Sequence, residues 1–312
     1  MSGRIVVVGS LNADLTIYCE RLPLPGETVH GTGFSVNPGG KSANQAVAAS
    51  KLGGTVSLIG AVGHDSNGDM LLASTAGAGV DVSRVRRSTE AGTGVAVIAV
   101  DARGENNIII SAGANGTLAP ADIPMDAFDD AAVLCLCLEV PLGTVEAAAK
   151  AAHDAGAPVL LNLSPYAEIP ERLAGLSDVL LLNAHEAAMF LGDAEMPGPS
   201  AAVSDWEPVR KQFAERGLRQ VLVTLGSGGS VVLDSLAATG ERISRISPTR
   251  VDAVDTTGAG DAFTGAVAAR LAAGDNLREA ARFASVAAAL ATTQRGTQSA
   301  YPSAAEVRNR LG

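Results

Sequence analysis

The chain has 312 residues, of which 47% are hydrophobic, 18% charged and 3% aromatic, and 23 Lys and Arg against 33 Asp and Glu leave a net charge of −10. This length and apolar content support one large or two ordinary domains with a substantial core, and they exclude an intrinsically disordered chain. The purest apolar stretch, Ala131 to Leu138, is too short to span a membrane, and the acidic balance argues against nucleic acid as a partner.

The start of the chain and its cysteines bear on the cellular compartment. The first four residues run directly into the expected strand Ile5–Val8, without the apolar core of a signal peptide. The three cysteines, Cys19, Cys135 and Cys137, are an odd number, which argues against a disulfide framework. Cys135 and Cys137 alternate on one expected strand, so they point to the same face, and packing in a reducing compartment explains them better than a metal site. We therefore expect a soluble cytoplasmic protein.

Short apolar runs and Ala-rich stretches alternate along most of the chain. Runs that are apolar on both faces are typical of parallel strands covered by helices. Six such runs are Ile5–Val8, Val56–Ile59, Val133–Leu138, Val159–Leu163, Val179–Leu182 and Val221–Leu225. Three helical stretches that each stop at a glycine are Ala43–Leu52, Val145–Ala155 and Ala262–Ala273. The alternation predicts an α/β fold, with a doubly wound, mostly parallel central sheet flanked by helices.

Two segments interrupt this alternation. Leu15–Val36 contains prolines, glycines and short alternating pieces but no helical pattern. Further along, Val95–Val100 and Asn107–Ser111 flank the turn Asp101–Gly104, which predicts a β-hairpin. We expect these segments, about residues 15–36 and 92–111, to form a small β-sheet that acts as a lid. Because no long linker separates them from the rest, residues 1–312 are expected to form a single domain.

The most informative tract is Asp252–Phe263, in which a strand-like piece ending at Asp255 precedes the glycine-rich turn Gly258–Gly260 and a helix that starts with Asp261. Small residues let the first-turn amides approach an anion closely, and the helix dipole adds partial positive charge there. The tract therefore predicts an anion hole for a phosphoryl group. The same helix start is expected to lower the pKa of Asp261. An alternative is that Asp261 only stabilises the start of its helix.

A second glycine tract, Asn37–Asn44, also opens a helix and contains Gly40-Lys41-Ser42, which resembles the end of a Walker A loop. Because Ser35 stands where that motif needs its first glycine, a P-loop nucleoside triphosphatase is disfavoured. The paired glycines expose backbone to a ligand, and Lys41 and Asn44 supply donors. The alternative is an ordinary turn before a helix.

Polar residues follow several of the expected strands. In open α/β sheets such loops at the carboxyl ends of the strands hold the ligand. Asn12 and Asp14 suit a vicinal diol, Glu139 ends another strand, and Asn183 and Glu186 could reach water around a magnesium ion. The glycine turn in Val223–Gly229 follows a further strand. No Gly-x-Gly-x-x-Gly fingerprint occurs, which counts against a dinucleotide enzyme.

The order and content of these tracts resemble the ribokinase-like carbohydrate kinase family, of the phosphofructokinase-B type. The matching motifs are Gly39-Gly-Lys-Ser-Ala-Asn44, Asn183-Ala-His-Glu186 and Asp255-Thr-Thr-Gly-Ala-Gly-Asp261, and the likeness covers nearly the whole chain. Within the family, Gly39–Ala49 and Gly113-Ala-Asn115 favour the members that phosphorylate ribose.

The resemblance implies ATP-dependent phosphorylation of the primary 5-hydroxyl of D-ribose, giving D-ribose 5-phosphate and ADP. It implies Mg²⁺, K⁺ as an activator, no nucleic-acid or membrane partner, and a homodimer that forms through the β-lid. One alternative is another kinase of the family, for fructose, 2-keto-3-deoxygluconate or a nucleoside, although the scarce aromatic residues argue against a nucleoside. Another is a non-catalytic sugar-binding regulator, against which the retained Asp261 argues.

The resemblance also implies roles for individual residues, position by position. Asp261 would be the catalytic base, beside an anion hole made by Gly258, Ala259 and Gly260. The sugar would be held by Asn12, Asp14, Gly39, Gly40, Lys41, Asn44, Glu139 and Asp261. The ATP site would be lined by Asn183, Thr224, Leu225, Gly226, Ser227, Gly228, Gly229, Gly260 and Ser285. Glu186 would act on Mg²⁺ through water, and a monovalent-cation site would be formed by Asp255, Thr257, Ala291, Gln294, Gly296 and Ala300.

Three positions depart from the family pattern. Ser42 replaces a glycine, which could crowd the sugar and shift specificity. Ser285 stands where a larger His or Asn often flanks the adenine. Ala300 replaces a common serine, which removes a hydroxyl from the expected potassium site, although backbone carbonyls could still bind the ion.

Overall fold

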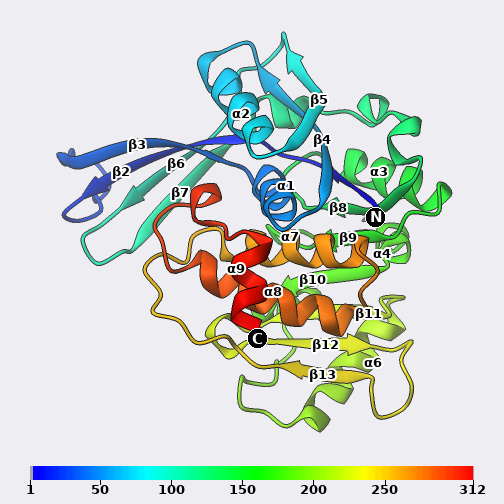
Figure 1. The fold of residues 1–312 in the computed structure, drawn as a ribbon. Helices are drawn as coiled ribbons and strands as arrows, with labels where there is room; N and C mark the ends of the chain where they lie inside the picture. Colours follow the sequence, from blue (N-terminus) through cyan, green and yellow to red (C-terminus); the bar gives the residue numbers. More distant parts are fainter. Residues whose placement is uncertain (1–2, 312) are drawn as a thin grey trace.

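A large mixed sheet runs through the centre of the molecule (Figure 1). The computed structural model describes residues 3–311, so residues 1–2 and 312 of the predicted single domain lie outside the described part. The described sheet has nine strands in the order β13-β12-β11-β10-β9-β8-β1-β4-β5. These are β1 (Arg4–Val8), β4 (Thr55–Gly63), β5 (Val80–Ser88), β8 (Ala131–Leu136), β9 (Val159–Asn162), β10 (Val179–Asn183), β11 (Gln220–Thr224), β12 (Ser230–Asp234) and β13 (Ile243–Ile246). The β11–β12 and β12–β13 pairs are antiparallel, and the other pairs are parallel.

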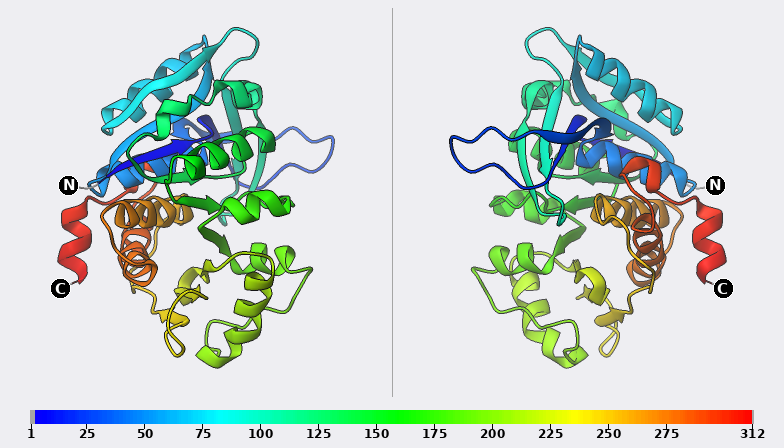
Figure 2. Two further views of the ribbon diagram at one scale, coloured as in Figure 1. Left: turned by 90° about the vertical axis from the view of Figure 1, so that its right-hand side faces the viewer. Right: turned by 90° about the vertical axis from the view of Figure 1, so that its left-hand side faces the viewer.

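Helices cover both faces of this sheet, as the side views of Figure 2 show. They are α1 (Lys41–Lys51), α2 (Ser66–Gly77), α3 (Leu142–Asp154), α4 (Glu171–Leu176), α5 (Ala184–Phe190), α6 (Glu207–Glu215), α7 (Ala259–Ala272), α8 (Leu277–Ala291) and α9 (Ala304–Leu311). In β1, Ile5 and Val7 belong to the core formed with α1, α7 and α8, whereas Val6 and Val8 belong to the core formed with α3, α5 and α6. Successive strand residues point to opposite faces, so an apolar run on β1 is needed to fill both cores.

The structure confirms the predicted core elements. Each of the six apolar runs forms a strand of the parallel part of the sheet, and each of the three helical stretches forms a helix. The glycines that follow these helices, Gly53, Gly156 and Gly274, all have positive φ, as a left-handed helix stop requires. One expectation is wrong: residues 251–255 form no strand. That segment is held instead by Thr292 O, which accepts from the main-chain N–H groups of Val254 and Asp255.

A second, smaller sheet projects beside the large one (Figure 1). Its order is β3-β2-β6-β7, with β2 (Asn12–Cys19), β3 (Gly31–Gly39), β6 (Gly94–Val100) and β7 (Asn106–Ser111). The predicted small sheet and its hairpin are therefore confirmed, although the paired strands extend further, to Asn12 and Gly39. Because β2 begins only a few residues after β1 ends, its first residues lie near the carboxyl edge of the large sheet.

Two further features concern membrane-spanning helices and the three cysteines. Among residues 3–311, no helix is both long enough and apolar enough to cross a membrane. Cys19, Cys135 and Cys137 are free and buried, and the latter two both contact α1, through Gln45 and Ser42 respectively.

Candidate active site

Parallel strands bring the predicted sugar and nucleotide residues to one edge of the large sheet. β1, β8, β9, β10 and β11 lie side by side, and their carboxyl ends meet at this edge. Asn183 and Thr224 end β10 and β11 and are paired in register, whereas Glu139 lies just beyond β8. Helix α1 starts at the same edge, because the N–H of Ala43 donates to the carbonyl of Ser10, directly after β1.

Asp261 lies in the first turn of α7 and is held by two amides of α1. Asn44 Nδ2 donates to one carboxylate oxygen at 2.9 Å, and Gln45 Nε2 donates to the other at 3.1 Å. Gln45 Nε2 also donates to Asn162 Oδ1 at the end of β9. Because a carboxylate oxygen can accept two hydrogen bonds, each Asp261 oxygen can still accept one more. The amides therefore orient the carboxylate without saturating it.

The expectation that the helix start lowers the pKa of Asp261 is wrong. Burial raises this pKa, and the opposing effects of Lys41, Asn44 and Gln45 do not cancel the cost of desolvating the carboxylate. The side chain is only 7% exposed. A raised pKa makes the carboxylate a stronger base than an ordinary aspartate.

Lys41 and Glu139 extend this cluster toward β1 and β8. Glu139 Oε2 accepts from Ser10 Oγ at 2.6 Å and from the main-chain N–H of Lys41 at 3.0 Å. Burial alone would lower the pKa of Lys41, but the carboxylates of Asp261 and Glu139 raise it overall. The ammonium group therefore stays protonated and supplies positive charge beside Asp261.

Asn12 and Asp14 face this cluster from the first strand of the small sheet. They are two residues apart in β2, so both side chains point to the same face. Burial, with added repulsion from Glu139 and Asp261, raises the pKa of Asp14 to about 7. A side chain at Gly39 would lie about 2.2 Å from the Asp14 carboxylate, so this position accepts only glycine without rearrangement.

The predicted anion hole lies where α7 begins. Gly258 has φ of +73°, and a Cβ there would lie 2.3 Å from Thr297 Cγ2, so both conformation and space require glycine. Its carbonyl accepts from Tyr301 OH at 3.2 Å. At Gly260, by contrast, an added Cβ would meet no atom within 4 Å. The first turn of α7 is therefore rigid behind Gly258 and open in front of Gly260.

The predicted nucleotide residues sit on two short turns. Asn183 and Glu186 form a capping box, in which Asn183 Oδ1 accepts from the N–H of Glu186 and Glu186 Oε2 accepts from the N–H of Asn183. The second turn follows β11 and closes where the N–H of Leu225 donates to Gly229 O at 2.8 Å. Its residues Gly226 and Ser227 are exposed.

The remaining nucleotide residue, Ser285, lies on α8. Its hydroxyl donates to Ser247 O at 3.3 Å, in the segment after β13. The structure thus places Ser285 beside the antiparallel end of the sheet and gives it a protein partner.

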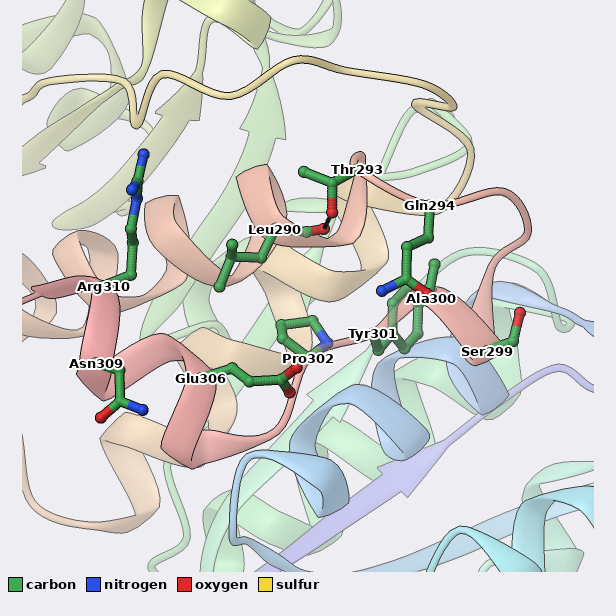
Figure 3. Close-up of a pocket in the computed structure, with 10 residues that line it drawn as sticks. All are labelled: Leu290, Thr293, Gln294, Ser299, Ala300, Tyr301, Pro302, Glu306, Asn309 and Arg310. Atoms are coloured by element: carbon green, nitrogen blue, oxygen red, sulfur yellow. Dashed lines mark hydrogen bonds between the residues drawn. The ribbon is translucent and has the colours of Figure 1, made fainter.

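The predicted cation residues converge only in part. Asp255 accepts from the N–H groups of Thr257 (2.9 Å) and Gly296 (3.0 Å). The second bond joins the segment before α7 to the loop after α8. Gln294 and Ala300 also line a pocket of about 570 Å³, together with residues of α9 (Figure 3). Ala291 is buried at the end of α8. Neither Asp261 nor the predicted sugar residues line this pocket, so it is separate from the carboxylate cluster.

The expected crowding of the sugar by Ser42 is not supported. Ser42 is fully buried, and its Oγ lies 3.0 Å from Cys137 Sγ. A Cβ at Gly9 would lie 2.0 Å from the same Oγ. The hydroxyl therefore fills space between α1, β1 and β8 rather than lining a ligand pocket.

Sequence reasoning missed three amides that contact the predicted site. Gln45 binds Asp261, Asn115 Nδ2 donates to Asn12 Oδ1 at 2.8 Å, and Gln298 Nε2 donates to Asn44 Oδ1 at 3.0 Å. Gln45 and Asn115 stand in tracts that the resemblance singled out, so those tracts were a usable signal. Gln298 stands between Gly296 and Ala300 of the predicted cation site, but its partner Asn44 is 254 residues away, so neither tract indicated their contact.

Comparisons with known proteins agree with this geometry. The family model described as pfkB family carbohydrate kinase matches residues 2–304. The ribokinase of Schizosaccharomyces pombe is 37% identical over 311 residues, covering 97% of this chain and 96% of that protein. The deoxyribokinase of Salmonella typhi is 35% identical over 305 residues, with coverages of 96% and 95%. The structure of Arabidopsis thaliana ribokinase complexed with ribose and ATP matches with a TM-score of 0.89 and 33% identity, covering 100% of this chain and 99% of that one.

Proposed function

The chain belongs to the pfkB family of carbohydrate kinases, and we propose that it transfers the γ-phosphoryl group of ATP to the 5-hydroxyl of D-ribose. The products are D-ribose 5-phosphate and ADP. The observation that carries this function is the setting of Asp261, which is held by two amides at the open N-terminus of α7. The ribokinases among its relatives, and the one solved with ribose and ATP, support ribose as the substrate.

Asp261 acts as the general base of this reaction. The proton of the sugar hydroxyl passes to a carboxylate oxygen, the new O–P bond forms, and the bond from the γ-phosphorus to the bridging oxygen of ADP breaks. Phosphoryl transfer has a loose transition state, so positioning and charge neutralisation supply most of the rate. The first-turn amides of α7 and the Lys41 ammonium supply positive charge where the transferred group develops negative charge.

The sugar is held by the side chains that converge from β2, α1 and β8. Asn12 and Lys41 are donors, whereas Asp14 and Glu139 are acceptors, which suits a ligand with several hydroxyl groups. Gly39 and Gly40 let these groups pack closely, because an added Cβ would lie 2.2 Å from the Asp14 carboxylate at Gly39 and 2.7 Å from the main-chain nitrogen of Asn12 at Gly40. On the other side, Asn183 and the Thr224–Gly229 turn hold the nucleotide, and Ser285 lies near its base.

The residues present fit a magnesium ion that is bound mainly by phosphate and water. No group of three or more His, Cys, Asp or Glu side chains among the described residues could hold a metal by itself. Mg²⁺ commonly uses one or two carboxylates together with substrate phosphates. Glu186 uses one oxygen in its capping box, which leaves the other for a metal-bound water. When bound, the ion neutralises phosphate charge.

A monovalent cation, K⁺, is the proposed activator, held near Asp255 and Thr257 by the loop after α8. The hydrogen bond from Gly296 to Asp255 brings the two segments together, and the carboxylate retains lone pairs for an ion. The Ala291, Gln294 and Ala300 main chain completes the site. Through Gly258, this loop also contacts the start of α7.

The small sheet acts as a lid over the sugar and as the contact between two subunits of a cytoplasmic homodimer. Its exposed apolar side chains are Ile17, Tyr18, Phe34, Val36, Val97, Ile108, Ile109 and Ile110. By strand register, Ile17, Phe34, Val36, Val97 and Ile109 share one face of the small sheet, and Tyr18, Ile108 and Ile110 share the other. Exposed apolar residues gathered on one face favour association with another protein surface. A closed lid would also exclude water from the phosphoryl donor.

Sugar-dependent ADP release tests the proposed function. The panel contains ribose, 2-deoxyribose, fructose, 2-keto-3-deoxygluconate and a nucleoside, each with and without K⁺. We expect the highest kcat/KM with ribose, stimulation by K⁺, and phosphate on O5 of the product. Turnover that is faster with another compound would overturn ribose as the substrate. Sugar binding without any turnover would favour the regulator instead.

A further inference from the structure

Two buried amides outside the predicted site each hold an asparagine of the sugar pocket by its carbonyl oxygen. Asn115 Nδ2 donates to Asn12 Oδ1 at 2.8 Å, and Gln298 Nε2 donates to Asn44 Oδ1 at 3.0 Å. Asn115 is 1% exposed and Gln298 is 6% exposed. An amide side chain has one acceptor end and one donor end, so occupying its oxygen decides where its NH₂ group points.

The donor ends of the two asparagines are directed toward the proposed chemistry. Asn44 Nδ2 donates to Asp261 Oδ2 at 2.9 Å. For Asn12, no protein group within residues 3–311 is seen to accept from Nδ2, which leaves this donor for a ligand. A reversed Asn44 would instead place its carbonyl oxygen against the Asp261 carboxylate, and the two acceptors would repel each other.

We propose that Asn115 and Gln298 are positioning residues that fix Asn12 and Asn44 as hydrogen-bond donors, the first toward the sugar and the second toward Asp261. The sugar part of this inference rests on the proposed function. Neither residue touches the sugar or the reacting atoms; each acts through the asparagine that it holds.

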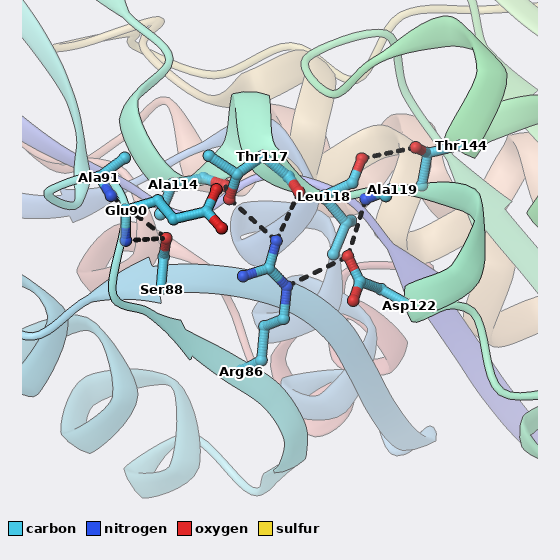
Figure 4. Close-up of polar contacts among 10 residues, drawn as sticks. All are labelled: Arg86, Ser88, Glu90, Ala91, Ala114, Thr117, Leu118, Ala119, Asp122 and Thr144. Carbon is cyan, nitrogen blue, oxygen red and sulfur yellow. Dashed lines mark hydrogen bonds and ion pairs between the residues drawn. The ribbon is translucent and has the colours of Figure 1, made fainter.

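Asn115 is suited to this task because its own position is fixed on both sides. Its amide pairs with the main chain of Leu11, accepting from the N–H and donating to the carbonyl, each at 3.0 Å. The turn that carries it, Gly113–Thr117, is anchored by Arg86 from β5, which donates to Thr117 Oγ1 at 2.9 Å and pairs with Asp122 at 3.2 Å (Figure 4).

Gln298 is fixed by the elements on either side of the catalytic carboxylate. Its main-chain carbonyl accepts from Lys51 Nζ, at the end of α1, at 2.6 Å, whereas its side-chain Oε1 has no hydrogen-bond partner among the described residues. The same ammonium group donates to Tyr301 O at 3.2 Å, and Tyr301 OH reaches Gly258 at the start of α7. The loop therefore connects the helix that carries Asn44 to the helix that carries Asp261, and Gln298 sits between them.

Neutral substitutions separate the two tasks. Gln298→Met removes the donor to Asn44 while keeping most of the volume, and we expect kcat to fall about tenfold, with a smaller change in the sugar KM. Asn115→Leu frees Asn12, which contacts the sugar away from the reacting hydroxyl. We expect it to raise the sugar KM about tenfold and to leave kcat within about threefold. This pattern follows when a lost contact binds the substrate and the transition state equally well.

A matched control separates positioning from general loss of structure. Gln220 also donates from a side-chain amide, to Asp234 at 2.9 Å, but between β11 and β12. Gln220→Met is expected to lower thermal stability without changing kcat or KM. If Gln298→Met or Asn115→Leu fails to fold, Gln298→Glu and Asn115→Asp serve instead. They keep the shape of each side chain but replace the donating NH₂ group with an oxygen that cannot donate when ionised. We expect the same split between kcat and KM from this second pair.

A titration that needs no sugar makes the test independent of the substrate. The carboxyl ¹³C resonance of Asp261, assigned by comparison with Asp261→Asn, reports its pKa directly. We expect Gln298→Met to raise this pKa above that of the unsubstituted protein, because Asn44 no longer donates reliably, and Asn115→Leu to leave it in place. Unchanged Asp261 titration together with unchanged kcat in the Gln298 variants, or equal effects of both substitutions on kcat, would overturn the proposal. If ribose is not phosphorylated at all, the proposed function fails, whereas the titration still decides the role of Gln298.

Discussion

The sugar half and the nucleotide half of the site are built in different ways. In the sugar half, carboxylates and amides are buried and bound to one another, as Asn44 and Gln45 are to Asp261. In the nucleotide half, the chain offers short turns with exposed residues such as Gly226 and Ser227. In the proposed function, the first half would recognise its ligand through oriented side chains, whereas the second would rely on main chain that is already folded into turns.

This difference has an energetic consequence. Side-chain recognition requires several charged groups to be buried together before the ligand arrives, and the raised pKa values of Asp14 and Asp261 record that cost. Turns made of main chain carry no such charge and lose little when a nearby side chain changes. We therefore expect substitutions that remove a buried charge from the sugar half to raise stability while lowering function, and substitutions in the nucleotide half to lower function without lowering stability.

The largest effect is expected at Asp261, where the two halves meet. Asp261→Asn should lower kcat by about 10²–10⁴-fold, because it removes the base while preserving the volume of the side chain. In the unsubstituted enzyme, activity should be lost as pH falls through the raised pKa of Asp261, since the base must be ionised. Steady-state ADP release measures both. Asp69→Asn, which alters an exposed carboxylate paired with Arg87, is the control. A kcat near that of the unsubstituted enzyme in Asp261→Asn would refute the assignment of the base.

The second-largest expected effect is at Asp14, where a substitution should lower ribose binding while it raises stability. Asp14→Asn should weaken ribose binding by about 10- to 100-fold, since it removes a charged acceptor. Between about pH 4 and pH 7 the folded protein keeps a proton on Asp14 that the unfolded chain has released, so stability falls as pH rises through this window. The loss is at most about 4 kcal/mol.

The asparagine of the Asp14→Asn variant cannot ionise, so thermal unfolding should show a higher melting temperature for the variant at pH 8 and little difference near pH 4. Ribose binding is measured by calorimetry on the same samples. A variant that is less stable at pH 8, or one that binds ribose normally, would contradict the description of the sugar half.

The smallest effect tests the nucleotide half. Gly260→Ala adds a methyl group where nothing lies within 4 Å, inside a helix that favours alanine. The free energy of unfolding should rise by up to about 1 kcal/mol, while kcat/KM for ATP should fall about tenfold because the methyl group occupies space needed by the phosphoryl group. Gly175→Ala in α4, which also has no atom within 4 Å, should gain stability without losing activity. Unchanged ATP kinetics in Gly260→Ala would place the phosphoryl group elsewhere.

The sequence predicted the regular part of this molecule well. The parallel strands were visible as runs that are apolar on both faces, whereas the edge strand β5 mixes charged and apolar residues and gave no such run. The glycine tracts identified both helix starts of the site, because their spacing is local in the chain. The same locality explains the error at Asp261, since a helix start is visible in sequence but burial by α1 is not. Gln298 was missed for the same reason.

The most direct test of the central claim is a structure of the ternary complex with D-ribose and a non-hydrolysable ATP analogue. We expect O5 of the sugar to lie within about 3.2 Å of an Asp261 oxygen, with the terminal phosphoryl group at the first-turn amides of α7. A sugar bound with another hydroxyl toward Asp261, or a phosphoryl group bound away from Gly258–Gly260, would contradict this assignment.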